Sequence, residues 1–363
     1  MERQKDLTFE AIAVRGDMAY GSDYHRNGLY KVNMVTGECE YLCLFKEESV
    51  DGRRLHCQAI WIDSKIYFIP GAAKNIAVYT PDSNRMEYIE IPHPIGKKYT
   101  FYKAGFKFIR AIERGNDLWL IPCSYPGIVK LNTLNGEIKI YDDWIAEDEY
   151  FFRLGLYVEN DKIIAANGKS NAVLIFDLES KSGIIEHVGR NNQGVMNICK
   201  VGDVYWLAPR LSGAIIVWNP KKNTVKEYDN YPDDFVSGNI VFSFVYRDSE
   251  DIIFIPAQAN KGIILNQKEA SIQSFDFQRE YENSTVGYLF ETNDERFFLE
   301  TKDDIFNRIF KINKNDHSIS QYRFYIKDDG DRDKDAICFL GKSHTVVRET
   351  LNFGLEDLIK GLS

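Results

Sequence analysis

The sequence lacks any paired-cysteine motif. Six cysteines are spread over 363 residues, and no two of them have the two-residue spacing of a redox or zinc site. Cys39 and Cys43 lie on one face of an expected strand, but they are too far apart for easy bridging. Cys57, Cys123 and Cys199 lie in or beside strand-like segments and are typical of small buried apolar residues. We therefore expect neither a disulfide scaffold nor a metal site.

Long apolar runs and an excess of basic charge are also missing. No stretch approaches the roughly 18 apolar residues of a membrane-spanning helix, and the N-terminus has no apolar signal-peptide region. The expectation is a cytoplasmic protein without a membrane span. The formal net charge of −9 argues against nucleic acid as a partner, because nucleic acid requires a basic face. A local basic pocket inside an acidic surface is compatible with this balance.

Recognised catalytic and cofactor motifs are absent as well. The sequence contains no GxSxG and no HExxH, and residues 341–343 lack the glycine that would begin a phosphate loop. The aspartate-rich run 328–335 lacks the terminal glutamate of a calcium loop, because Leu340 occupies that position. We expect no cofactor, and the catalytic residues are unknown.

What the sequence has instead is a repeated segment, clearest at residues 58–70, 110–122 and 197–209. In each copy an aromatic residue lies 9 positions, and a proline 12 positions, after the polar residue that opens the segment. The three sets are Gln58, Tyr67 and Pro70; Arg110, Trp119 and Pro122; and Asn197, Trp206 and Pro209. A spacing held over this length is typical of a repeat architecture.

The repeats predict an all-β fold, a seven-bladed β-propeller. Successive proline-equivalent positions are 52, 45, 42 and 47 residues apart, and each unit divides into four short strands, as a propeller blade does. The proline ends the second strand, where the ladder no longer needs its N–H. We expect a propeller over residues 1–326, with blades at about 7–46, 55–92, 106–142, 151–189, 194–229, 239–277 and 285–326.

Residues 327–363 differ from the repeats. We expect a polar linker at 327–335, followed by a C-terminal amphipathic helix, since apolar residues recur at helical spacing at Val347, Leu351, Leu355, Leu358 and Leu362. This helix would either dock on the propeller or bind a partner. Ring closure is expected from packing between the first and last blades, reinforced by residues 336–342 as an added edge strand.

The third unit, GNDLWLIPCSYPGIVKLNTLNGEIKIY, resembles the repeat of the virginiamycin B lyase family: a glycine turn, an aromatic, a short loop, Gly-Ile, then Gly-x-Ile. The chain also looks like kelch-like and other bacterial propellers, although it has no repeated WD dipeptide and no kelch double glycine. The resemblance implies a propeller fold. For the lyase family it further implies metal-dependent ring opening by His and Glu near the channel mouth, a role to which no residue here is assigned.

In a propeller the first strand of each blade lines the central channel, and loops on one face surround its mouth. The candidate ligand-binding residues at the start of inner strands are Glu10, Gln58, Arg110, Arg153 and Asn197. Those in the loops are Lys74, Asn75, Tyr125, Asn171, Arg210 and Gln258. Two arginines on an inner ring could bind a carboxylate, phosphate or sulfate. Alternatively, these groups bond neighbouring carbonyls and channel waters.

Two functions remain open from the sequence. The first is a recognition or scaffold propeller that binds a protein or peptide partner through its loops, with the aromatic segments 93–105 and 143–152 as the rim. The alternative is a lyase- or hydrolase-like enzyme, or a small-molecule binder, acting on an anionic or sugar-containing ligand held by Arg110 and Arg153.

Overall fold

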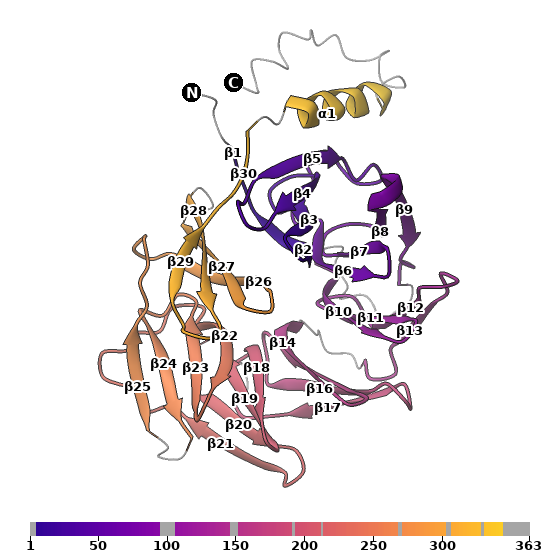
Figure 1. Cartoon of the computed structure of the whole chain (residues 1–363). Coiled ribbons are helices and arrows are strands. Elements are labelled where there is room, and N and C mark those ends of the chain that lie inside the picture. The colour runs from indigo at the N-terminus through magenta and orange to yellow at the C-terminus, as the bar shows by residue number, and fades with distance from the viewer. Residues whose placement is uncertain are drawn as a thin grey trace, which may run out of the picture.

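Seven antiparallel sheets of four strands surround a central channel in the computed structural model (Figure 1). The structure describes residues 5–94, 106–145, 152–190, 193–211, 213–267, 271–302, 306–327 and 330–343. In every sheet the strands follow chain order, so that each blade is one up-and-down meander. The prediction of an all-β seven-bladed propeller with a short C-terminal helix is confirmed.

The strands of the first four blades are short and evenly spaced. Blade 1 has β2 (Phe9–Arg15), β3 (Met18–Asp23), β4 (Leu29–Asn33) and β5 (Cys39–Cys43), and blade 2 has β6 (His56–Ile62), β7 (Lys65–Pro70), β8 (Asn75–Thr80) and β9 (Arg85–Glu90). Blade 3 has β10 (Phe108–Arg114), β11 (Asp117–Pro122), β12 (Ile128–Asn132) and β13 (Ile138–Tyr141), and blade 4 has β14 (Phe152–Glu159), β15 (Lys162–Asn167), β16 (Ala172–Asp177) and β17 (Ser182–His187).

The remaining blades follow the same plan. Blade 5 has β18 (Val195–Val201), β19 (Val204–Pro209), β20 (Ile215–Asn219) and β21 (Thr224–Tyr228), and blade 6 has β22 (Phe242–Asp248), β23 (Asp251–Pro256), β24 (Lys261–Asn266) and β25 (Ile272–Asp276). Blade 7 has β26 (Thr285–Glu291), β27 (Glu295–Lys302), β28 (Phe306–Asn313) and β29 (Ile319–Tyr322). A single turn of 3₁₀ helix, η1 (Pro81–Ser83), joins β8 to β9.

A β-bulge in the inner strand recurs around the ring and shapes the channel. In blade 2, His56 pairs with Pro70 and Gln58 with Ile69, which leaves Cys57 unpaired between them. The corresponding register shift leaves Glu10, Ile109, Met196, Ser243 and Leu289 between the paired residues of blades 1, 3, 5, 6 and 7. A bulge re-aims side chains locally. Apart from Ser243, all of these unpaired residues line the central cavity.

The ring is closed by both ends of the chain. Strand β1 (Lys5–Leu7) pairs antiparallel with β30 (Phe324–Ile326), and Phe324 packs in a core shared by blades 1 and 7 with Phe9 and Phe290. Closure therefore includes the expected packing between the first and last blades. It also includes a ladder between the two ends of the chain, which sequence reasoning did not anticipate.

The C-terminal helix begins earlier than predicted. Helix α1 (Gly330–Ser343) covers part of the expected polar linker and the whole expected edge strand at 336–342, so both of those predictions are wrong there. Asp331 and Asp333 lie in its first turn, where their negative charges stabilise the helix by interacting with the positive end of its dipole. The helix predicted from Val347 to Leu362 lies outside the described residues, and the division of the chain at 326 and 327 stays a prediction.

Helix α1 lies on the outer side of blade 1, beside β5 (Figure 1). The buried Arg332 side chain donates to the backbone carbonyls of Asn27 at 2.9 Å and Val50 at 3.4 Å. The Tyr41 hydroxyl of β5 donates to Asp335 at 2.9 Å. The helix thus covers part of one blade edge that would otherwise expose unpaired backbone groups.

Candidate functional site

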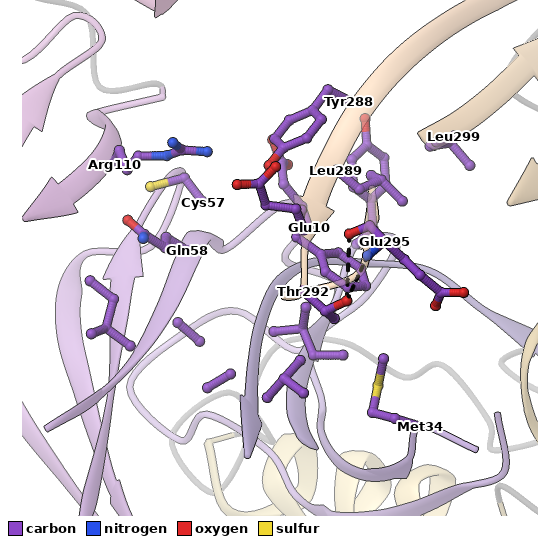
Figure 2. A pocket seen from close by; sticks show the side chains of 18 of the residues that line it. Glu10, Met34, Cys57, Gln58, Arg110, Tyr288, Leu289, Thr292, Glu295 and Leu299 are labelled. Atoms are coloured by element: carbon purple, nitrogen blue, oxygen red, sulfur yellow. Dashed lines mark hydrogen bonds between the residues drawn. The ribbon is translucent and has the colours of Figure 1, made fainter. Parts of the chain in front are cut away.

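The central channel encloses a cavity of about 1120 Å³. Its walls come from the inner strands β2, β6, β10, β18 and β26, together with loops at both ends. Figure 2 shows Arg110, Cys57 and Gln58 on one wall, with Tyr288 and Leu289 of β26 on the other. The cavity therefore joins blades that lie far apart in the sequence, and it is the first candidate for a ligand site.

One end of the cavity, here called the mouth, is formed by Tyr24, Arg54 and Phe106. The Arg54 guanidinium lies 5.0 Å from the centroid of the Tyr24 ring and 4.6 Å from that of Phe106. It binds both carboxylate oxygens of Glu10, with Nη2 2.9 Å from Oε1 and Nε 3.1 Å from Oε2. Burial alone would lower the pKa of Arg54, but Glu10 raises it above its usual value. The mouth is thus a fixed arrangement of one cation and two aromatic rings.

Deeper in the cavity, Arg110 of β10 points toward Tyr288 of β26 (Figure 2). The Tyr288 ring stacks on Phe244, with centroids 4.4 Å apart and an interplanar angle of 9°. Burial raises the pKa of Tyr288 to about 12, although Arg110 works in the opposite direction by its charge and a hydrogen bond. Tyr288 is therefore a protonated hydroxyl donor at neutral pH, held in place by blade 6 and facing blade 3.

The opposite end of the cavity is acidic. Its lining includes Asp17, Glu291, Asp294 and Glu295, with Lys314 among them. Lys314 lies 3.3 Å from Glu291, and Lys311 lies 2.6 Å from Glu295, so two of these carboxylates are paired with cations. The cavity is consequently asymmetric in charge, with its guanidinium groups near one end and most of its carboxylates near the other.

Of the residues predicted on the inner strands, Glu10, Gln58 and Arg110 line the cavity. The Gln58 side-chain oxygen accepts a hydrogen bond of 2.7 Å from the Ala111 N–H, so it also ties blade 2 to blade 3. Asn197 is buried and does not line the cavity. Arg153 lies in β14, but its side chain is outside the described part of the structure.

The six predicted loop residues do not line the cavity and bond neighbouring loops instead. The Lys74 and Asn75 N–H groups donate to Glu48, and the Tyr125 hydroxyl donates to the Pro92 carbonyl. Asn171 donates to the Gly189 carbonyl, Arg210 donates to the Gly168 carbonyl, and Gln258 bonds both the Ile240 N–H and the Thr285 hydroxyl. These contacts hold neighbouring loops together, and a ligand role for the six residues stays a prediction.

Sequence reasoning missed the three residues of the mouth. Tyr24 lies in the loop between β3 and β4, whereas Arg54 and Phe106 lie in the connections that lead into β6 and β10. None of them is at a repeat position. Arg54 also has a left-handed backbone with φ of 49°, which a local sequence pattern does not reveal. Only the ring geometry brings these connections together.

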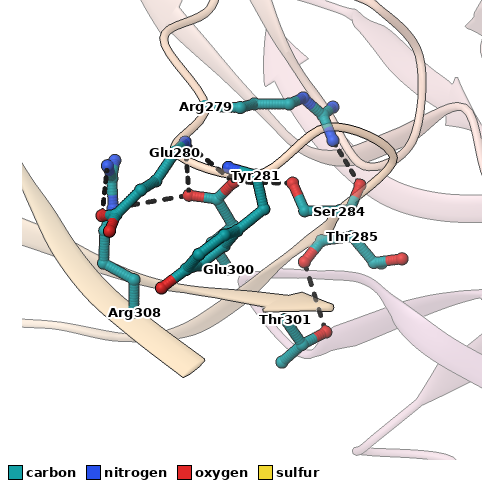
Figure 3. Close-up of polar contacts among 8 residues, drawn as sticks. All are labelled: Arg279, Glu280, Tyr281, Ser284, Thr285, Glu300, Thr301 and Arg308. Atoms are coloured by element: carbon teal, nitrogen blue, oxygen red, sulfur yellow. Dashed lines mark hydrogen bonds and ion pairs between the residues drawn. The ribbon is translucent and has the colours of Figure 1, made fainter. Parts of the chain in front are cut away.

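A second polar cluster lies where blade 6 passes into blade 7 (Figure 3). The fully buried Glu300 carboxylate accepts hydrogen bonds from the Ser284 hydroxyl at 2.6 Å and from the N–H groups of Glu280 and Tyr281 at 3.1 and 3.2 Å. Arg308 lies 3.4 Å from its other oxygen. Because this carboxylate is satisfied by the segment it binds, its evident role is to fix that connection.

The surroundings constrain two potentially reactive side chains of the cavity. Cys57 lines it, but burial raises the pKa of that thiol well above its usual value, so the thiol stays protonated and weakly nucleophilic. The Glu10 carboxylate is held by Arg54. Among the described residues, no group of three His, Cys, Asp or Glu side chains is placed to hold a metal ion.

Comparison with solved structures gives the class of protein, a seven-bladed propeller. A streptogramin B lyase aligns with a TM-score of 0.56 at 16% identity, over 82% of this chain and 93% of the lyase. Virginiamycin B lyase from Staphylococcus aureus aligns with a TM-score of 0.56 at 18% identity, over 82% and 94% of the two chains. YCF48 bound to D1 peptide aligns with a TM-score of 0.58 at 12% identity, over 83% and 92%.

These likenesses support the resemblance to lyase-like propellers at the level of fold. At such low identity a shared fold does not carry a shared activity. No family model matches the chain, and no curated protein matches it in sequence. Within the described residues, no helix is long and apolar enough to cross a membrane.

Proposed function

We propose that this chain is a recognition propeller that binds an extended segment of a protein or peptide partner at the channel mouth. The observation that carries the proposal is the mouth itself, where Glu10 holds Arg54 between the rings of Tyr24 and Phe106. Tyrosine and arginine are over-represented among residues that dominate binding energy at interfaces. A cation and two rings that are already fixed lose little conformational freedom when a partner binds.

The cavity behind the mouth supports this function. Its volume of about 1120 Å³ is slightly above the range of typical ligand pockets, and it is large enough for a few residues of a peptide. Among the structural neighbours, YCF48 is bound to a D1 peptide. That neighbour indicates what the fold can do, whereas the argument for this chain rests on its own mouth.

The same volume favours a second candidate, a binder of a small anionic or sugar-containing molecule within the channel. Such a ligand would use Arg110 and the polar cavity walls and would depend little on the mouth. A lyase- or hydrolase-like activity belongs with this second candidate. It would require a proton-transferring group placed beside the bound ligand, and the carboxylates of Asp17 and Asp294 at the acidic end are the candidates in the described lining.

The test is selection of binding peptides from a displayed library of random decapeptides on the purified full chain. The double substitution Tyr24→Ala and Phe106→Ala should weaken binding of a selected peptide by about tenfold or more, the usual effect of removing two aromatic anchors. The control substitutes the exposed Leu134 and Val236 with alanine, and binding should be unchanged. Full binding by the mouth variant, with its thermal stability intact, would rule out the proposed mode.

A further inference from the structure

Arg110 is the starting observation, because it projects into the channel without a carboxylate partner. It comes from inner strand β10 and is half-buried in the cavity wall. No Asp or Glu among the described residues forms an ion pair with it. Glu10, the carboxylate at the mouth, already binds Arg54 through both of its oxygens. This end of the cavity therefore holds two guanidinium groups and one carboxylate.

The surroundings of Arg110 make this unmatched charge costly. Unpaired bulge residues of four inner strands line the same cavity with apolar or weakly polar side chains, namely Cys57, Ile109, Met196 and Leu289. A cation that is partly removed from water beside such groups gains strongly from an anion. The whole chain carries a net charge of −9, so a positive excess here is local and not a general property of the surface.

Tyr288 supplies a second donor at the same place. Its hydroxyl faces Arg110, while its ring is stacked on Phe244 and lies edge-on to Phe298 with centroids 5.8 Å apart. Only 8% of Tyr288 is exposed, so the hydroxyl is held in one position before any ligand arrives. A guanidinium and a phenol that converge from blades 3 and 7 can together donate to the two oxygens of one carboxylate.

We propose that Arg110 and Tyr288 form a carboxylate-binding site inside the channel, which receives a carboxylate of the ligand that enters through the mouth. The inference rests on the proposed function for the route of entry, but not for the chemistry of the site. The carboxylate can be a peptide C-terminus or the side chain of an acidic residue. Both offer the same planar pair of oxygens, and the experiment below separates them.

The first measurement uses a small probe that does not need the mouth. Binding of 3-phenylpropionate and of 3-phenylpropionamide to the full chain is measured by calorimetry at equal ionic strength. The acid should bind about tenfold or more tightly than the amide, since only the acid can accept charge-assisted hydrogen bonds. Arg110→Met should abolish this preference. Tyr288→Phe should reduce it by about threefold to tenfold, as expected for the loss of one hydroxyl donor.

The control is Arg114→Met, at the exposed end of the same strand β10. It removes one positive charge without touching the cavity and should leave the preference for the acid unchanged. Equal binding of acid and amide to the unmodified chain, absence of binding by both, or a preference that survives Arg110→Met would each overturn the proposal.

The second measurement uses a peptide selected on the mouth. It is synthesised with a free or amidated C-terminus and, separately, with each glutamate replaced by glutamine. Loss of about tenfold in affinity with only one of these changes identifies the source of the carboxylate, provided that Arg110→Met removes the difference. If no change to the peptide matters, the site is not used by peptides and the proposal fails for them.

The two proposals can fail separately. Peptides that depend on Tyr24 and Phe106, together with a probe that shows no preference for the acid, would leave the proposed function standing and remove the carboxylate site. A preference for the acid that requires Arg110, without any mouth-dependent peptide, would do the reverse and favour a small carboxylate as the ligand.

Discussion

At the residue scale, the first position of the inner strands holds the blades together. Phe9, Phe108, Phe152 and Phe242 are fully buried there, each paired with the residue at the proline position of the next strand. Blade 2 has His56 instead. Its Nδ1 lies 2.9 Å from the Ser22 hydroxyl, and its ring packs against those of Phe45 and Phe68. A titratable ring thus occupies a site that four other blades fill with phenylalanine.

Burial of His56 predicts a specific acid sensitivity. Burial lowers its pKa from 6.5 to about 3, so the folded protein keeps the ring neutral while the unfolded chain takes up a proton below about pH 6.5. The free energy of unfolding should therefore fall as the pH drops from about 6.5 toward 3, by at most about 1.4 kcal/mol per pH unit from this group. Above pH 6.5 the group contributes no pH dependence.

The measurement is urea unfolding between pH 7 and 4.5 for the unmodified chain and for the double variant His56→Phe, Ser22→Ala. The variant restores the phenylalanine of the other blades and leaves no hydroxyl unpaired. The variant should lose less stability over this range, because it lacks the histidine that takes up a proton on unfolding. All other titrating groups are common to both proteins, so the difference in slope reports on His56. Identical slopes for the two proteins would show that His56 does not stay neutral in the fold.

At the element scale, helix α1 is coupled to the loops that form the mouth. Arg332 bonds the carbonyls of Asn27 and Val50, and the buried Asn27 side chain in turn bonds both the N–H and the carbonyl of Phe45. The Arg54 N–H, a few residues further along, donates to the Tyr24 carbonyl at 2.8 Å. The helix therefore supports the two connections that present Tyr24 and Arg54.

Replacing Arg332 with alanine should loosen those connections before it unfolds the propeller. The change leaves the buried Asn27 carbonyl and the partly buried Val50 carbonyl without their donor, and we expect a loss of about 1–3 kcal/mol in stability. Hydrogen exchange should speed up at the amides of residues 45–54 and little in blades 3 to 6. Lys334→Ala, an exposed residue on the same helix, is the control and should change neither. Unchanged exchange at 45–54 in the Arg332 variant would contradict the coupling.

At the scale of the whole molecule, stability depends on a closed ring. Blades 1 and 7 share one core, in which Phe324 contacts Phe9 at a centroid distance of 5.0 Å and Tyr322 at 5.0 Å. The β1–β30 ladder lies over this core, and the Tyr325 N–H donates to the Gly37 carbonyl at 2.9 Å. Side-chain packing and backbone pairing thus both hold the first and last blades together.

Phe324→Ala should open this junction selectively. Removing a fully buried phenylalanine costs about 3–5 kcal/mol. Phe254→Ala, in the core between blades 5 and 6, removes the same side chain from an equally buried position and is the matched control. Hydrogen exchange should accelerate at β1, β2 and β30 in the first variant, and in blades 5 and 6 in the second. The same pattern of exchange in both variants would show that the ring has no special point of closure.

Most of the fold was predictable because blade structure is encoded locally. The spacing from polar residue to aromatic to proline sets strand length and turn position within about a dozen residues, so the sequence alone indicated seven blades. Part of the site was predictable for the same reason, since Glu10, Gln58 and Arg110 occupy defined places on inner strands that line the cavity. The tail was misjudged because an aspartate-rich run is compatible both with a solvated linker and with a helix N-terminus.

The amino-acid sequence by itself determined the repeat, the number of blades and which polar residues lie on the inner strands. Only the tertiary structure decided which of those residues meet. Tyr24, Arg54 and Phe106 share no repeat position, and Arg110 and Tyr288 are separated by four blades of chain, yet ring closure sets the first three at one mouth and the last two face to face. The physical reason is that strand pairing is specified by neighbours in the chain, whereas the contents of the channel depend on the curvature of the whole ring.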